Sequence, residues 1–326
     1  MKRAAIVGAV LVLAMGSFAE SNSQNPSTPQ NPPAAQPGTA QPGTAQPGTA
    51  QPGTAQPGTA QPGATPQAEP QGKRPPQTKT QAEFDAYKAA ATNTDPAALE
   101  KAANDFAAKF PDSEVRIILF KTAMRAYQSA NNADKTLELG RKVLAIDPDD
   151  PEALVIVASV LAERTHDTDL DKDQRLDEAM KMAQHATQTV DTDVSVPAGT
   201  PQDKVDAYKG LLRSNAYSII GTLEFKKDNF KAAETDLRKS IDAFPAQPDP
   251  VVVLRLALAL DKQDRYPEAL TYATKASELT QENTPAGGLA RRECERVAQL
   301  AKQPKPPACG AGTPATPAQN QVPPKQ

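Results

Sequence analysis

Residues 214–245 (SNAYSIIGTLEFKKDNFKAAETDLRKSIDAFP) carry the pattern that decides the fold, and residues 250–276 (PVVVLRLALALDKQDRYPEALTYATKA) repeat it. In both stretches apolar side chains stand at offsets 4 and 7 of a 34-residue frame, a small one stands at 8, and a second group stands at 17, 20, 24 and 27. Because residues three and four apart in a helix share a face, each group marks one face of a separate helix. Small side chains at offsets 8, 20 and 27 let the two helices approach closely. The repeat-defining residues are Tyr217, Gly221, Phe230, Ala233, Tyr266, Ala269, Ala273 and Ala276.

Weaker copies of the same frame cover the preceding part of the chain. Two frames begin at Ile117 and Pro151, and a fifth, which departs most from the pattern, begins near Thr80. In the frame from Ile117, Gly140 occupies offset 24 and predicts a gap in the packing. In the frame from Pro151, the second helix is delayed by nine residues. Residues 203–213 predict an N-terminal extension of the next first helix.

These sequences resemble tetratricopeptide repeats (TPR) over residues 80–302. The resemblance implies an all-α fold, an α-α superhelix (solenoid) of about five TPR-like helical hairpins. Gly287-Gly288 is expected to break the chain after the last hairpin. A C-terminal capping helix with one apolar face then closes the array, as such arrays require. A generic helical bundle with accidental 34-residue spacing is the alternative.

The first 19 residues are typical of a secretory signal peptide. Lys2 and Arg3 precede an apolar run over residues 4–16, which is too short to span a bilayer comfortably. Small residues then allow cleavage after Ala19. The alternative is an uncleaved anchor. The signal predicts export to the periplasm or cell envelope, or secretion, and no membrane span after cleavage.

Both ends of the chain have a low-complexity composition that cannot build a core. Residues 20–79 are predicted to be a disordered Pro/Gly-rich linker, since the pentapeptide QPGTA recurs there from Gln36 onward. Residues 304–326 are predicted to be a disordered Pro-rich tail for the same reason. The repeat domain therefore spans residues 80–303.

Charge and motif content argue against nucleic-acid binding and against catalysis. Residues 80–303 contain 29 basic and 37 acidic residues, a net charge of −8 that repels phosphate backbones. His166 and His185 lack partners at metal-ligand spacing, and the sequence contains no phosphate-binding loop, nucleophile elbow or zinc motif. The sequence therefore predicts a protein that is not an enzyme and that has no cofactor.

One acidic segment is similar to a helix-loop-helix calcium site. Carboxylates occupy positions 1, 3, 5, 7 and 12 of a 12-residue loop, as such a site requires. However, Lys172 stands where glycine makes the sharp turn. We therefore interpret the segment as a hydrophilic insertion and predict no metal site. The carboxylates are Asp167, Asp169, Asp171, Asp173 and Glu178.

The chain contains only two cysteines, Cys294 and Cys309. Export to an oxidising compartment favours a disulfide between them. The alternative is a free Cys294 buried in the capping helix.

The TPR resemblance also implies a binding surface, a concave groove lined by offsets 2, 5, 9, 12 and 13 of each first helix. Lys121 and Arg125 lie one turn apart there, and in an acidic domain this predicts a site for a carboxylate-bearing segment. Arg125 replaces the Asn that family members use to clamp a terminal carboxylate, so that ligand is not predicted. The alternative is that groove residues pack on neighbouring repeats. The predicted groove residues are Lys121, Arg125, Ser159, Asn215, Ser218, Thr222, Phe225, Leu254 and Leu258.

Two functions fit these observations. The first is an exported TPR scaffold that mediates protein–protein interaction through the groove, with a protein or peptide partner of unknown identity. The alternative is a structural or tethering envelope protein that binds through its Pro-rich linker, with the repeats as a spacer.

Overall fold

The computed structural model describes residues 72–197 and 199–310. The predicted signal peptide, almost all of the predicted linker and the last 16 residues lie outside the described residues.

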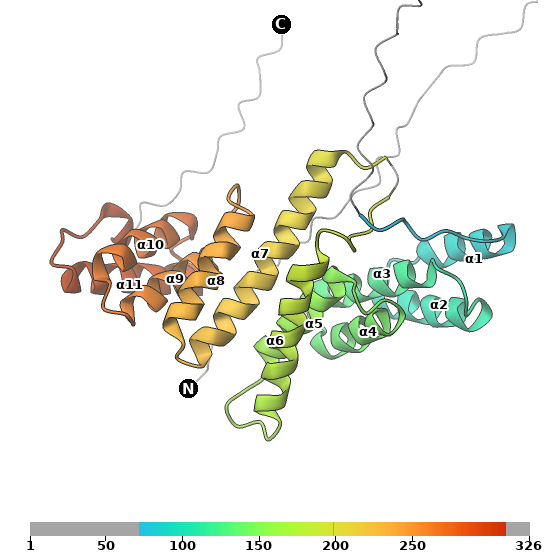
Figure 1. The fold of residues 1–326 in the computed structure, drawn as a ribbon, viewed down its shortest axis with the longest axis horizontal. Helices are drawn as coiled ribbons and strands as arrows, with labels where there is room; N and C mark the ends of the chain where they lie inside the picture. Colours follow the sequence, from blue (N-terminus) through green and yellow to red (C-terminus); the bar gives the residue numbers. More distant parts are fainter. Residues whose placement is uncertain (1–71, 198, 311–326) are drawn as a thin grey trace, which may run out of the picture. The chain divides into compact units, whose positions relative to one another are not determined.

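Helices make up the secondary structure of the described residues, which contain no strand (Figure 1). The first hairpins contain α1 (Gln81–Ala91), α2 (Pro96–Lys109), α3 (Arg116–Ser129), α4 (Ala133–Ile146), α5 (Pro151–Arg164) and α6 (Lys172–Thr189). The remaining elements are α7 (Gln202–Lys226), α8 (Phe230–Ala243), α9 (Pro250–Asp261), α10 (Tyr266–Leu279), α11 (Pro285–Leu300) and the 3-10 helix η1 (Pro307–Cys309).

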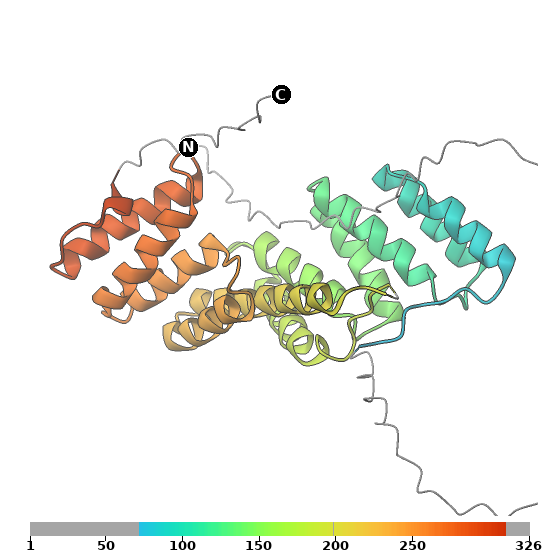
Figure 2. The same cartoon turned by 90° about the horizontal axis from the view of Figure 1, so that it is seen from above.

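Each helix packs against its neighbours in the sequence (Figures 1 and 2). Helices α1 to α10 form five successive hairpins, and α11 packs on α10. The first helices of adjacent hairpins also touch, since α3 contacts α1, and α7 contacts both α5 and α9. The predicted all-α helical-repeat fold with a capping helix is therefore confirmed.

Most of the first helices of these hairpins end in the same left-handed turn. Asn131, Asp228 and Asp264 have φ values of 60°, 59° and 57°, and each stands at offset 15 of its frame. Asn and Asp tolerate this conformation better than other residues with a side chain. The next residue donates its N–H to the carbonyl five residues back, as Asn229 does to Glu224 at 3.0 Å. In the third hairpin Thr165 occupies offset 15 in an extended conformation, so the second helix starts late.

Small residues bring the two helices of a hairpin, or adjacent hairpins, into close contact. A Cβ added to Gly221 would lie 2.8 Å from Leu237 Cγ, so α7 and α8 could not pack as they do with a larger side chain there. Gly140 does not leave the predicted gap. A Cβ on Gly140 would collide with a methyl group of Val157 from α5, so the next hairpin fills the space.

The glycine pair near the C-terminus does not break the chain as predicted. Helix α11 begins at Pro285, and Thr284 caps it by accepting a hydrogen bond from the Gly287 N–H at 3.0 Å. A Cβ on Gly287 would collide with the Gln281 carbonyl oxygen. The glycine therefore permits a close approach to the preceding turn inside a continuous helix.

Two short segments outside the predicted bounds of the repeat domain, residues 80–303, make specific contacts with it. Residues 72–79, assigned to the linker, pack along the loops between hairpins. Residues 304–310, assigned to the tail, contain η1, which packs on α10 and α11. Composition alone predicted both segments to be disordered, and polar contacts and a disulfide hold them in place.

Candidate functional site

The predicted groove residues lie on the first helices, and the structure gives them different roles. Lys121 of α3 lies 2.7 Å from Asp150 Oδ2 and 2.9 Å from Glu152 Oε2. Arg125, one turn later, forms a bidentate ion pair with the same Glu152. Both carboxylates come from the start of α5, the first helix of the next hairpin. We call Lys121, Arg125, Asp150 and Glu152 the inner ion cluster.

Three side chains of the inner ion cluster are mostly removed from water, and the fourth, Arg125, is 46% exposed. The Lys121 side chain is 14% exposed and the Glu152 side chain is 8% exposed. Burial by itself raises the pKa of Glu152, but the charges of Lys121 and Arg125 outweigh it and lower that pKa to about 2. Burial and the Glu152 charge raise the pKa of Tyr208, which lies in the N-terminal extension of α7. The two basic side chains of the cluster therefore face two carboxylates of the same chain.

Lys121 and Arg125 were predicted to form a site for a carboxylate-bearing segment, and the structure places carboxylates of the same chain beside both. Their charges are already met by carboxylates of the same chain. A partner's carboxylate that bound Lys121 would have to displace Glu152 or Asp150, which themselves are buried. The cluster therefore joins α3 to α5 and offers no free charge.

A second basic pair lies on the next two first helices. Lys226 at the end of α7 donates a hydrogen bond to the Ala162 carbonyl oxygen of α5 at 2.8 Å. Arg255 in the middle of α9 is half-buried. Among the described residues, no carboxylate lies within ion-pair distance of either side chain, and the Arg255 guanidinium makes no hydrogen bond. We call Lys226 and Arg255 the open basic pair.

The electrostatics of the open basic pair are opposite to those of the inner ion cluster. Burial and the neighbouring Arg255 charge lower the pKa of Lys226. Burial also lowers the pKa of Arg255, because the charges of Asp249 and Glu163 compensate it only in part. Glu163, on α5, is exposed and accepts a hydrogen bond from the Ser159 hydroxyl at 2.9 Å. An additional carboxylate at this position would therefore meet two under-compensated cations.

The sequence pattern did not assign Arg255 to the groove, since it stands at offset 6 of its frame. A signal was nevertheless present. Arg255 is the one charged residue between Pro250 and Asp261, in the apolar run VVVLRLALAL. A charge kept in such a run marks a position that faces away from the core.

The other predicted groove residues divide into helix-surface polar groups and core residues. The Thr222 hydroxyl donates to the Ser218 carbonyl in its own helix at 2.7 Å, and Asn215 is half-buried on the same helix. Leu254 and the half-buried Leu258 pack in one cluster with Ala290 of α11. Phe225 meets Phe230 edge-on, with ring centroids 5.3 Å apart. The leucines therefore serve the packing of the C-terminal hairpins.

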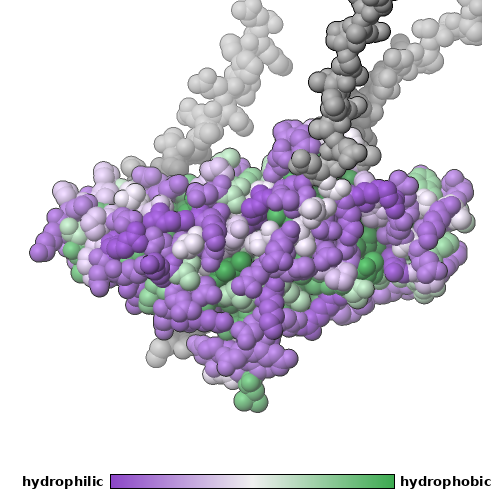
Figure 3. Space-filling view, in the orientation of Figure 1, coloured by the Kyte–Doolittle hydropathy of each residue, from purple (hydrophilic) through white to green (hydrophobic). Residues whose placement is uncertain are grey.

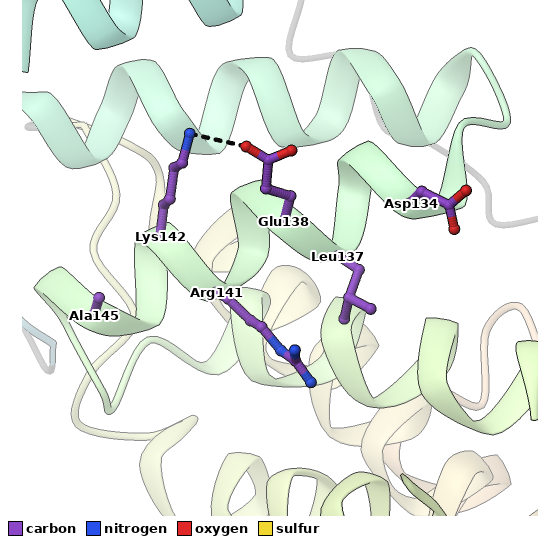
Figure 4. A pocket seen from close by; sticks show the side chains of 6 residues that line it. All are labelled: Asp134, Leu137, Glu138, Arg141, Lys142 and Ala145. Carbon is purple, nitrogen blue, oxygen red and sulfur yellow. Dashed lines mark ion pairs between the residues drawn. The ribbon is translucent and has the colours of Figure 1, made fainter. Parts of the chain in front are cut away.

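The outer face of α4 has a shallow hollow, which the close-up in Figure 4 shows. Its charges are met locally, because Lys142 pairs with Glu138 at 3.0 Å and Arg141 pairs with Glu178 of α6 at 2.9 Å. Asp134 and Leu137 complete its lining with Ala145. The hollow therefore lacks an unmet charge.

Hydrophilic residues predominate on the face seen in Figure 3. Large exposed apolar side chains of the described chain lie on α1, in the loop before α6, on α10 and at two positions of α11, and Leu170 in that loop is the most exposed. Isolated apolar residues of this kind are normal on a soluble surface.

The acidic loop before α6 does not gather its carboxylates around one point. Lys172 Nζ lies 2.9 Å from Asp167 Oδ1, and Glu178 faces Arg141. Asp173 already lies in the first turn of α6. Within the described part of the chain, no group of three or more His, Cys, Asp or Glu side chains has the arrangement of a metal site.

The C-terminal cysteines lie together. The structure joins Cys294 of α11 to Cys309 of η1 by a disulfide, with Cα atoms 5.3 Å apart. Both residues are buried against α9 and α10 in one core cluster. The bond holds η1 on the capping helix.

Comparison with known proteins gives little further information. No family model matches the chain, and no curated protein matches it in sequence. Among solved structures, the chain is similar to the assembly chaperone of RpL4 (Acl4), residues 1–338, with 13% identity and a TM-score of 0.34 over 68% of this chain and 99% of that one. A likeness at this level carries no argument about function. None of the helices formed by residues 72–197 and 199–310 combines the length and apolar character that crossing a membrane requires.

Proposed function

We propose that this protein is an exported scaffold of the tetratricopeptide type, without catalytic activity, that binds a segment of another protein along its first helices. The observation that carries the proposal is the open basic pair. Lys226 and Arg255 come from adjacent first helices and have no carboxylate partner among the described residues. A helical-repeat array exposes its first helices as an extended surface, which is how such proteins bind their partners.

The chemistry of the pair specifies the bound segment. Arg presents a planar fork of donors that suits a carboxylate, and Lys adds a second positive charge. The surrounding domain is acidic overall, with 29 basic and 37 acidic residues over 80–303, so an unmet basic pair is a local feature. The partner segment is therefore expected to carry a carboxylate, from Asp, Glu or a chain end.

The N-terminal sequence supplies the rest of the proposal. A signal peptide over residues 1–19 directs export, and the Pro/Gly-rich linker holds the repeat domain at a distance from whatever its N-terminal end contacts. The second candidate function is the tether, in which the linker binds the partner and the repeats serve as a spacer. The QPGTA repeats favour it, since they form a regular series of identical short segments.

One experiment separates the two functions. Partner proteins are captured from cells on three baits: residues 20–326, the same chain with Lys226→Ala and Arg255→Ala, and the same chain without residues 20–71. Lys181→Ala with Lys231→Ala serves as a matched control, because both lysines are exposed on second helices. A groove-binding scaffold loses its partner only on the second bait. A tether loses it only on the third.

A further inference from the structure

The residues immediately before α1 form an extended segment on the surface, which we call the strap (residues 72–79). Pro75 and Pro76 lie at its centre and favour an extended backbone without helix or sheet hydrogen bonds. Figure 1 shows the segment running from α1 towards the loop between α6 and α7. The strap therefore spans several hairpins along one edge of the array.

The N-terminal half of the strap binds the connection between α4 and α5 and the connection between α6 and α7. Lys73 Nζ lies 2.7 Å from Asp147 Oδ2, just before α5, and 3.6 Å from Asp193 Oδ1, just after α6. The Lys73 N–H also donates to the Val194 carbonyl oxygen at 3.2 Å. A Cβ added to Gly72 would lie 2.8 Å from that carbonyl oxygen, so glycine permits this approach.

The second half of the strap binds the connection between α2 and α3. Arg74 Nη2 donates to both carboxylate oxygens of Glu114, each at 2.8 Å. The Gln77 N–H donates to the same carboxylate at 3.1 Å, and Lys79 Nζ donates to the Asp112 carbonyl oxygen at 3.0 Å. The two prolines set the spacing at which Arg74 and Gln77 reach one carboxylate.

The acceptors of the strap come from three successive junctions between hairpins. We call Glu114, Asp147 and Asp193 the acidic edge. Glu114 precedes α3, Asp147 follows α4, and Asp193 follows α6. Without the strap, this edge would present three carboxylates along one side of the array.

The contacts between strap and edge are of the kind that water and salt weaken. The side chains of Lys73 and Arg74 are 41% and 59% exposed, and that of Glu114 is 39% exposed. Exposed ion pairs contribute little individually and are screened by salt. The strap is therefore held by many weak polar contacts, with its two prolines only half-buried.

From this arrangement we infer that the acidic edge is a binding site for an extended basic segment, and that the strap occupies it in competition with such a segment of a partner protein. The strap defines the ligand: two adjacent basic residues, then a short extended stretch with a free backbone N–H. The site is separate from the open basic pair and takes the opposite charge. The inference does not depend on the proposed function.

The test uses a synthetic peptide with the sequence of residues 70–80 and the chain from residue 20 to 326. Lys73→Glu with Arg74→Glu repels the strap from the edge without changing the acceptors. A tethered strap competes at an effective concentration on the order of 1 mM, so the variant is expected to bind the peptide at least about tenfold more tightly than the wild type. Binding should weaken when salt is raised, and a peptide with Glu at both basic positions should not bind.

Two measurements show that the peptide binds at the edge. Hydrogen exchange should show faster exchange at the Lys73 and Gln77 amides in the variant than in the wild type, with the α3 and α5 amides unchanged. Adding Glu114→Lys and Asp147→Lys to the variant should restore that protection by reversing both sets of charges, and should abolish binding of the basic peptide. This charge reversal also distinguishes loss of the site from loss of the fold.

Several results would overturn the inference. One is a released strap, shown by fast exchange, in a variant that binds no peptide. A second is equal affinity of wild type and variant for the peptide, which would mean that the peptide binds elsewhere. A third is unchanged protection of the strap amides in the variant, which would mean that the ionic contacts do not hold the strap in place. If the variant loses its helix content, wild-type exchange between low and high salt decides instead. Salt-independent protection of the strap would then contradict the inference.

Discussion

Two pairs of basic side chains on the first helices of this array differ in whether carboxylates of the same chain pair with them. Lys121 and Arg125 of α3 are matched by buried carboxylates from the next hairpin. Lys226 and Arg255, on α7 and α9, have no carboxylate within ion-pair distance among the residues that the structure describes. Basic residues on first helices thus join neighbouring hairpins in one place and have no carboxylate partner among the described residues in the other.

For Lys226, the difference comes from the start of the next first helix. Helix α5 begins Asp150-Pro151-Glu152, and both of its carboxylates reach back to α3. Helix α9 begins Asp249-Pro250-Val251, so the position that Glu152 occupies in α5 is apolar in α9. A basic residue in a repeat is therefore a binding candidate only when the next hairpin lacks the acid that would neutralise it.

The largest expected effect follows from removing the shared carboxylate of the inner ion cluster. Glu152→Gln leaves Lys121 and Arg125 without their main counter-charge, and should lower the free energy of unfolding by about 3–5 kcal/mol. Glu163→Gln, near the open basic pair, is the control and should change it by less than about 0.5 kcal/mol, since Glu163 is exposed. Urea denaturation followed by circular dichroism measures both. If both substitutions lowered the free energy of unfolding equally, the proposed difference between the two pairs would be wrong.

Acid should also lower the free energy of unfolding, by protonating Glu152 of the inner ion cluster. The folded-state pKa of Glu152 is about 2, below its ordinary value of 4.5. Its stabilising contribution is therefore complete above about pH 4.5 and is lost as the pH falls towards 2, by an amount on the order of 3 kcal/mol. Denaturation curves between pH 6 and pH 2 should show this loss in the wild type. Glu152→Gln should flatten the dependence, and an equally steep curve in that variant would assign it to other carboxylates.

Truncating the open basic pair should affect binding and leave the fold intact. Lys226→Ala with Arg255→Ala should weaken affinity for a captured partner by about 1–3 kcal/mol if the pair acts as a desolvated anchor. Isothermal calorimetry with the purified partner gives the value, and the exposed-lysine control (Lys181→Ala with Lys231→Ala) should leave affinity unchanged. Lys121→Ala with Arg125→Ala should lower stability instead. A variant pair with the reverse pattern would place the site on α3.

The smallest expected effect is the change in the free energy of unfolding when Arg255 of the open basic pair is replaced. Arg255→Leu removes a half-buried charge that has no carboxylate partner within ion-pair distance in the described residues, so stability should stay constant or rise by up to about 1 kcal/mol. Thermal unfolding of the variant tests this. A clear loss of stability would mean that Arg255 has a structural role.

The helical hairpins could be predicted because each is encoded within its own frame. Tyr217, Gly221 and Ala233 determine by their spacing alone which faces of α7 and α8 meet. Contacts between hairpins could not be predicted in this way. The frame that contains Lys121 and Gly140 ends at Asp150, so it contains neither Glu152 nor the Val157 methyl that fills the space beside Gly140.

The strap was missed for a related reason. Residues 72–79 have the composition of the linker, and what holds them is a set of single polar contacts to Glu114, Asp147 and Asp193 rather than an apolar face. Those acceptors lie 40 or more residues away in the sequence, in loops between hairpins. The spacing of apolar residues along the sequence does not indicate such contacts.

Photo-crosslinking in cells that produce the protein tests most directly whether a partner binds beside the open basic pair. A photoreactive residue replaces Lys262, which is exposed at the end of α9, or, as a control, Lys231 on the second helix α8. We expect one protein to be crosslinked from position 262 and not from 231, and this product to decrease when Arg255→Ala is added. Crosslinking that is equal at both positions, or unchanged by Arg255→Ala, would contradict binding along the first helices.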